Sequence, residues 1–160
     1  MEFYTIGVYN SSEANFYQKL IENKIDTFCD IRQRRGVRGS KYSFVNSKQL
    51  QSKLQNHNIK YIHSLDLAPT KEIRALQKEA DLNNSELKRN RRSLGQVFIN
   101  EYNNQIINTF NFNQFIIDLE NLNANKIVLF CVEEDHKACH RSLVAEKLSS
   151  MEYQFQVKNI

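Results

Sequence analysis

The sequence predicts an α/β fold: a single domain of three layers, in which a mostly parallel sheet carries helices on both faces. Short apolar segments alternate with longer stretches of helical periodicity. The segment from Lys126 to Val132 is apolar enough for a strand buried on both faces. No linker-like tract divides the chain, and 160 residues with 41% hydrophobic side chains suffice for one substantial core. We therefore expect one domain over residues 1–160.

The first part of the chain is predicted to alternate strand, helix, strand, helix and strand. Strands are expected at 3–8, 25–31 and 59–62. Each helix between them has polar cap candidates before its apolar residues. These are Asn10, Ser11 and Ser12 before Phe16, Leu20 and Ile21, and Ser47 before Leu50 and Leu54.

The second part begins with a polar helical segment around residues 69–107. Pro69 and Thr70 suit a helix start, and Asn83 with Asn84 suggests an interruption. Beyond it, Asn113 is expected to open a helix that buries one apolar side, followed by a strand, a helix and an edge strand. The helix that Asn113 opens is expected to bury Phe115, Ile116 and Leu119. The strand after it spans 126–132, the next helix spans 141–150 and buries Leu143, Val144 and Leu148, and the edge strand spans 155–157.

Loops with unusual chemistry follow three of the predicted strands. Because parallel strands end at the same edge of a sheet, the loops 7–10, 32–43 and 133–141 should lie at one edge. Ligands usually bind in the crevice at such an edge, where the strand order reverses. We therefore predict that these loops form the functional face.

Composition excludes several classes of protein. The longest apolar run, Ile127 to Val132, is far shorter than the roughly 20 residues of a membrane span, and we expect neither secretion nor membrane insertion. Three cysteines in a chain of this size favour reduced thiols and a cytoplasmic location. The net charge is only +4, but basic residues are bunched between Arg32 and Lys41 and again at Lys88, Arg89, Arg91 and Arg92.

The sharpest local motif is Cys139-His140-Arg141, which follows Cys131 by seven intervening residues. A thiol at a helix start lies near backbone N–H groups that lower its pKa, so Cys139 could be a nucleophile. The guanidinium of Arg141 could bind a phosphate or carboxylate through paired hydrogen bonds. Cys131 could equally be a small buried strand residue. Glu133 opens an acidic run, Glu133 to Asp135, that could move a proton or simply be solvated.

A zinc site is a further reading of the same segment. Cys131, His136, Cys139 and His140 offer four suitable ligands within ten residues. Their spacing lacks the paired Cys-x2-Cys knuckles of common structural sites, and no second ligand pair occurs elsewhere. We therefore expect no metal and no other cofactor.

The arginine segment suggests an anion site. Asp30 and Arg32 fall on the same side of a strand, where they could form a structural ion pair or supply an oriented guanidinium and a base. Arg35 belongs to a segment that mixes charge with aromatic surface, as nucleic-acid-binding and nucleotide-binding surfaces do, but the charge alone is equally consistent with a solvated loop. The other residues of this segment are Arg34, Arg38, Lys41, Tyr42 and Phe44. Cys29 and Arg35 share the Cys-x5-Arg spacing of cysteine phosphatases, but no glycine lies between them and Asp30 would repel an anion. His57 and His63 are weak candidates.

The chain resembles the Domain of Unknown Function 488 family over nearly its whole length. Four landmarks occur in order: Thr5-Ile6-Gly7 with Asn10, Asp30-Ile31-Arg32, Tyr61-Ile62-His63, and Cys131 with Glu133 before Cys139-His140-Arg141. Val8 and Tyr9 stand where the family typically has His and Ser, and Arg34 and Arg35 where it often has Pro. The resemblance implies an α/β fold and a common functional face with Asp30, Arg32, Cys131, Glu133, Cys139, His140 and Arg141, but no reaction.

Three functions are consistent with these residues. The first is an enzyme or binding protein for an anionic, phosphate-bearing ligand such as a nucleotide or nucleic acid. Arg32, Arg35 and Arg141 would bind the anion beside Gly7, Asn10 and Cys131, with Cys139, His140, Glu133 and Asp30 as catalytic residues. The second is a non-catalytic nucleic-acid-binding module, and the third is a cysteine-based redox or metal sensor.

Overall fold

A five-stranded sheet with strand order β3-β2-β4-β1-β5 forms the centre of the computed structural model, which describes residues 1–83, 85 and 92–160. Every pairing in this sheet is parallel, so the predicted α/β class is confirmed and the sheet is wholly rather than mostly parallel. The strands are β1 (Glu2–Ile6), β2 (Thr27–Asp30), β3 (Lys60–His63), β4 (Lys126–Phe130) and β5 (Val157–Asn159).

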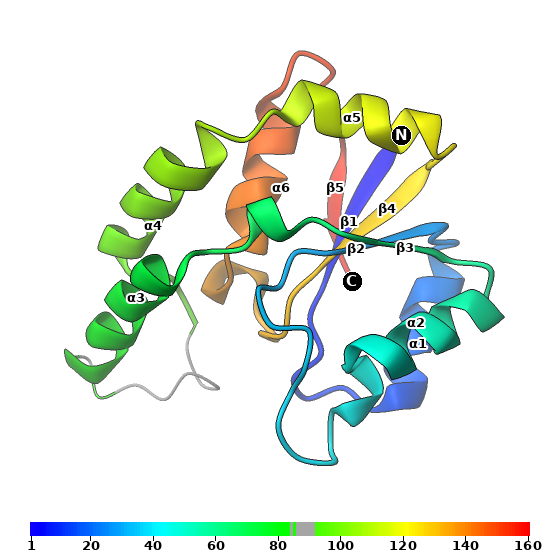
Figure 1. Ribbon diagram of the computed structural model, residues 1–160, viewed down its shortest axis with the longest axis horizontal. Helices are drawn as coiled ribbons and strands as arrows, with labels where there is room; N and C mark the ends of the chain where they lie inside the picture. Colours follow the sequence, from blue (N-terminus) through cyan, green and yellow to red (C-terminus); the bar gives the residue numbers. More distant parts are fainter. Residues whose placement is uncertain (84, 86–91) are drawn as a thin grey trace.

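Helices cover both faces of the sheet, which gives the predicted three layers (Figure 1). One face carries α1 (Glu13–Glu22) and α2 (Ser47–Asn56). The other carries α3 (Lys71–Asn83), α4 (Gln96–Tyr102), α5 (Phe112–Asn121) and α6 (Arg141–Ser150). Shorter turns are η1 (Ser43–Val45), η2 (Leu65–Leu67), the π-helical η4 (Asn103–Ile107) and η5 (His136–Ala138). Among the described residues no helix combines the length and hydrophobicity that crossing a membrane requires.

The core has two parts, one on each face of the sheet, and β4 contributes to both. Ile127 and Leu129 pack with the residues of α5 and α6, whereas Val128 and Phe130 pack with those of α1 and α2. Successive side chains of a strand point to opposite faces, so a strand between two helical layers needs apolar residues at every position. This is why the run at 126–132 is uninterrupted.

The helix starts differ from the prediction in detail. Ser12 caps α1 as expected, since its side chain accepts a hydrogen bond from the backbone N–H of Asn15. Ser47 does not cap α2; it is the first helical residue, and Asn46 occupies the cap position. Asn and Ser are almost equally good caps, so neighbouring candidates cannot be separated by residue type alone.

The fifth helix is also shifted from its predicted start. It begins at Phe112 and is capped by Asn111, whose side chain accepts from Gln114, so the assignment of Asn113 was wrong. In α1, Ile21 is 51% exposed rather than inward-facing, because it lies off the face that carries Phe16 and Leu20.

The described parts of the polar segment 69–107 fold as α3, α4 and η4. Thr70 lies directly before α3, near the predicted helix start, and its hydroxyl accepts from the backbone N–H of Ile73. Of the two residues at which an interruption was predicted, Asn83 ends α3, whereas Asn84 lies outside the described residues, as do the basic residues Lys88, Arg89 and Arg91.

The strand order creates a switch point at the centre of the sheet. From β1 and β2 the chain departs through α1 and α2 on one face, whereas from β4 it departs through α6 on the other. β4 lies between β2 and β1. At the carboxyl edge, the loop after β4, which runs to one face of the sheet, therefore stands beside the loops after β1 and β2, which run to the other face. A crevice is expected at such a place.

Candidate functional site

A pocket of about 680 Å³ occupies the switch point. The loops after β1, β2 and β4 line it together with α3 and α4. Among the described residues, five of the lining side chains are basic and two are acidic. The charged residues are Arg32, Arg34, Arg38, Arg74, Lys78, Asp81 and Glu133, and the others are Tyr9, Gln33, Gly36, Val37, Tyr42, Pro69, Gln77, Leu94, Phe98, Cys131, Val132, Cys139 and His140.

A compact cluster of two thiols and an imidazole borders this pocket. The Nδ1 atom of His140 lies 3.7 Å from the Sγ atom of Cys139 and 3.9 Å from that of Cys131. All three side chains are buried, and their ligand atoms lie within 4.8 Å of one another. The strand end at Cys131 and the start of α6 therefore lie side by side.

Electrostatics within the cluster separate the two thiols. Burial raises the pKa of Cys139, but the hydrogen bond from Cys131 and the positive charges of His140 and Arg141 outweigh it, and the pKa lies well below its ordinary value. The hydrogen bond with Cys139 is the main cause that holds the pKa of Cys131 well above its ordinary value, with burial next. Burial lowers the pKa of His140, yet the charge of Cys139 reverses this and raises it.

Asp30 and Arg32 form a buried, bidentate ion pair. Arg32 Nε donates to Asp30 Oδ1 at 2.9 Å and Nη2 donates to Oδ2 at 2.8 Å, while the Tyr61 hydroxyl donates to the same Oδ2. Nη2 also donates to the carbonyl of Val45, and the guanidinium lies 4.5 Å above the ring of Phe130. Arg32 lines the pocket, but its charge is balanced by Asp30, which is not a lining residue. The geometry thus favours the structural ion pair over a base at Asp30.

Arg141 and Gly7 position the loop after β4 instead of lining the pocket. The guanidinium of Arg141 is buried and donates from Nη1 to the carbonyl of Glu133 at 2.6 Å and from Nη2 to that of Glu134 at 2.8 Å. A Cβ atom on Gly7 would lie 2.0 Å from the same Glu133 carbonyl oxygen. These contacts favour a positioning role for both residues over the anion contact predicted from the sequence.

Asn10 connects the three loops of the carboxyl edge. It has a positive φ of 61°, its backbone N–H donates to the Tyr42 hydroxyl at 2.9 Å, and its side-chain amide donates to Glu134 at 2.5 Å. A small polar residue tolerates this left-handed conformation better than most. Asn10 therefore holds loops together rather than lining the pocket.

Other predicted candidates lie outside the pocket lining. Arg35 is exposed on the β2 loop. His63 Nε2 lies 2.9 Å from the Arg32 carbonyl, and His136 lies 3.7 Å from Asp135, away from the thiols. Cys29 is fully buried in β2, where burial raises the pKa of its thiol, so it lacks the exposure of a phosphatase nucleophile.

Four polar or charged pocket-lining residues that were not predicted from the sequence come from α3. Arg74 and Lys78 are four residues apart and line the pocket, as do Gln77 and Asp81. The Gln77 amide donates to Asp81 at 2.7 Å and its carbonyl accepts from the N–H of Gly95 at 2.8 Å, which ties α3 to the start of α4. The i, i+4 spacing of both pairs was the available signal, since it places them on one helix side.

Comparison with known proteins gives a family but no described relative. No curated protein and no solved structure matches the chain. The family model described as Domain of unknown function DUF488 matches residues 12–148, which include α1 through α5, most of α6 and most of the site. The part of the sequence that carries the Asp30-Ile31-Arg32 and Cys139-His140-Arg141 motifs lies within the match. The chain therefore belongs to the DUF488 family.

Proposed function

We propose that this protein is an enzyme or binding protein for an anionic, phosphate-bearing ligand such as a nucleotide or a segment of nucleic acid. The observation that carries the proposal is the charge of the pocket: five basic side chains and two acidic ones line it. The basic residues come from two separate parts of the chain, the β2 loop and α3. We call these the two basic walls of the pocket: Arg32, Arg34 and Arg38 on the β2 loop, and Arg74 and Lys78 on α3. A ligand with more than one negative charge could bridge them.

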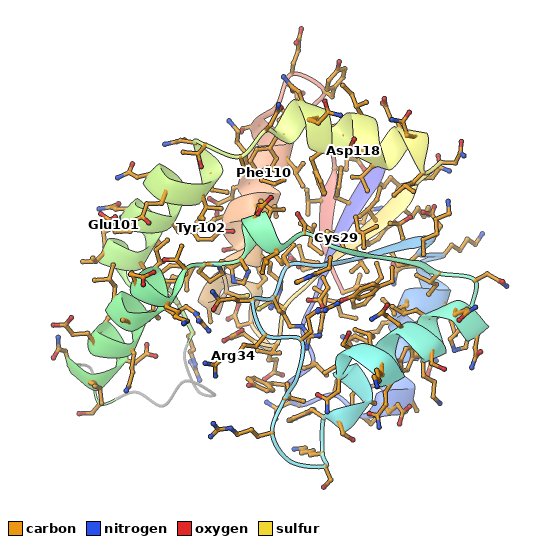
Figure 2. The ribbon with its side chains drawn as sticks, viewed as in Figure 1. Cys29, Arg34, Glu101, Tyr102, Phe110 and Asp118 are labelled. Carbon is orange, nitrogen blue, oxygen red and sulfur yellow. The ribbon has the colours of Figure 1, made fainter. Side chains whose placement is uncertain are left out.

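The basic side chains of the β2 loop differ in their exposure. Arg32 is fixed by Asp30, whereas Arg34 and Arg38 are exposed on the loop that follows. Figure 2 shows Arg34 extending from this loop toward the side of the molecule that carries α3. Guanidinium groups bind phosphate oxygens in pairs of hydrogen bonds, and Arg74 and Lys78 supply donors from the opposite wall.

An aromatic pair beside the basic residues favours a nucleotide over a simple phosphate. The rings of Tyr9 and Tyr42 lie 5.3 Å apart, and both residues line the pocket. Aromatic side chains stack on the faces of bases with little preference for sequence. Chemistry on the ligand would take place at the end that reaches Cys139, His140 and Glu133, the catalytic residues that we propose.

Equilibrium binding of nucleotides and short single-stranded oligonucleotides tests the proposal. We expect binding to raise the melting temperature, and affinity to fall as salt rises because phosphate contacts are electrostatic. Arg74→Ala and Lys78→Ala should each weaken binding by about tenfold or more, since a charge-assisted hydrogen bond contributes about 1.5–3 kcal/mol. Calorimetric titration measures both effects.

Lys19→Ala is the matched control, because it removes the same charge from the exposed face of α1. It should leave affinity nearly unchanged. If the control lost as much affinity as the α3 variants, or if affinity did not depend on salt, the results would contradict specific binding of the ligand in the pocket. Chromatography of the ligand after incubation separates an enzyme from a binding module, since only an enzyme converts it.

A further inference from the structure

We infer that Cys131, Cys139 and His140 form a binding site for one zinc ion, with a fourth coordination position that faces the pocket. This inference goes beyond the proposed function, which depends on the basic walls and the aromatic pair. It rests on the positions of three ligand atoms, on the orientation of the imidazole and on the place of the cluster in the fold.

The distances fit the edges of a tetrahedron around zinc. With Zn–S of about 2.3 Å and Zn–N of about 2.0–2.1 Å, a tetrahedral site places sulfur and nitrogen roughly 3.6 Å apart. The two sulfur–nitrogen distances are 3.7 Å for Cys139 and 3.9 Å for Cys131. Ordinary hydrogen bonds do not require two thiols to converge on the same imidazole nitrogen, whereas a shared metal ion does.

The imidazole of His140 is oriented as a metal ligand. Its Nε2 atom lies 3.1 Å from the carbonyl oxygen of Ile31, which can only accept a hydrogen bond. In the neutral ring the proton is therefore on Nε2, and the lone pair of Nδ1 points to the two sulfurs. Ligating histidines commonly donate their second nitrogen to a backbone carbonyl in this way.

Burial of the cluster favours a cation that balances two thiolates. Cys131, Cys139 and His140 are only 6%, 1% and 6% exposed. Two buried thiolates would be costly without compensation, but with Zn²⁺ and a neutral imidazole the total charge is zero. Soft sulfur with one imidazole suits zinc better than Mg²⁺ or Ca²⁺, which prefer oxygen.

The fourth position would be open to the pocket. All three ligands line the pocket, and Glu133 places Oε2 3.5 Å from the Cys131 sulfur. Sites with three protein ligands and an open position are typical of catalytic zinc, where water or a ligand oxygen completes the shell. A phosphate held by the basic walls could reach such an ion.

Metal analysis of the full chain, purified without chelators, tests the inference. We expect about one zinc per chain by atomic emission. After removal with a chelator, Co²⁺ should bind with an intense sulfur-to-cobalt charge-transfer absorption and blue-green tetrahedral bands. Cys131→Ser, Cys139→Ser and His140→Ala should each lose most of this absorption.

Cys29→Ser is the matched control, because Cys29 is a buried thiol of β2 outside the cluster. It should keep the full cobalt signal. Should the cluster variants fail to fold, the wild-type chain still decides. Zn²⁺ should protect Cys131 and Cys139 from alkylation, read by mass spectrometry, and leave the reactivity of Cys29 unchanged.

Any one of three results would overturn the zinc site. These are a metal-free chain that takes up neither Zn²⁺ nor Co²⁺, equal alkylation of Cys131 and Cys139 with and without Zn²⁺, and loss of the cobalt signal in Cys29→Ser. The nucleotide titration, repeated on chelator-treated protein, reports separately on the basic walls. Retained binding there with no metal uptake would remove the zinc and leave the proposed function standing.

Discussion

Residues next to each other in the Cys139-His140-Arg141 motif do different things. The ring of His140 faces the two sulfurs, whereas the guanidinium of Arg141 is buried against the backbone carbonyls of Glu133 and Glu134. His140 therefore belongs to the cluster that we propose as functional. Arg141 fixes the loop that carries Glu133, so the motif combines a candidate functional group with its structural support.

Gly7 tests how closely that loop must pack. In Gly7→Ala the new Cβ would overlap the carbonyl oxygen of Glu133, at 2.0 Å, so the loop has to move. We expect a loss of about 1–3 kcal/mol in the free energy of unfolding, as for other overpacked sites. Urea denaturation measures it. Gly36→Ala is the control, because its Cβ would meet only Asn46 at 3.7 Å, and a loss as large there would refute the steric explanation.

The ion pair of Asp30 and Arg32 gives a second stability prediction. Asp30→Asn leaves the guanidinium of Arg32, only 3% exposed, without a compensating charge. Breaking one side of a buried pair typically costs about 3–5 kcal/mol. The exposed pair of Lys53 and Glu13 is the control, and Glu13→Gln should change the unfolding free energy by less than about 1 kcal/mol. Similar losses in both variants would show that burial is not the cause.

At this scale the sequence indicated which residues form the thiol–imidazole cluster better than it indicated the residues that support it. Cys131, Cys139 and His140 were recognisable from unusual residue types near a strand end. Asn10, Gly7 and Arg141 were also singled out, but their roles depend on contacts with loops that come from distant parts of the chain. Residue type alone does not say whether a guanidinium meets a ligand or a carbonyl.

At the scale of elements, α3 and α4 form the wall that the sequence described least well. Their polar composition gave no clear inward face, and the α3 side chains that line the pocket are themselves polar or charged. Figure 2 shows Tyr102 on α4 turned toward the interior, where its hydroxyl donates to the Leu67 carbonyl at 2.6 Å. Ile73, Phe98 and Tyr102 are buried in the core and hold this largely polar segment to the rest of the molecule.

Gln77 is the residue that connects these two helices. Gln77→Ala removes the acceptor for the N–H of Gly95 and the donor to Asp81. We expect a loss of about 1–3 kcal/mol in unfolding free energy and weaker ligand binding, because Arg74 and Lys78 belong to the same helix. Denaturation and titration measure the two effects. Gln96→Ala, which removes an exposed amide that bonds within its own helix, should change neither; a comparable change would argue against the connection.

For the whole molecule, the alternation of apolar and helical segments was enough to predict a parallel sheet with helices on both faces. It did not give the order of the strands, because pairing depends on side-chain packing between segments far apart in the chain. Glu2 pairs with Lys126, and Thr27 pairs with Ile127. The prediction that three loops share one edge followed from parallel pairing alone, and it is confirmed by the residues that line the pocket.

The central place of β4 has a consequence for synthesis. The ribosome makes β1, β2 and β3 long before β4, and until then β1 and β2 have no strand between them to join their facing edges. The emerging polypeptide must therefore keep two strand edges from pairing wrongly while the residues between Asp30 and Lys126 are translated. Insertion of β4 joins β1 to β2 and places Cys131 at the carboxyl edge, so the pocket can form only after β4 and the loop that follows it have been made.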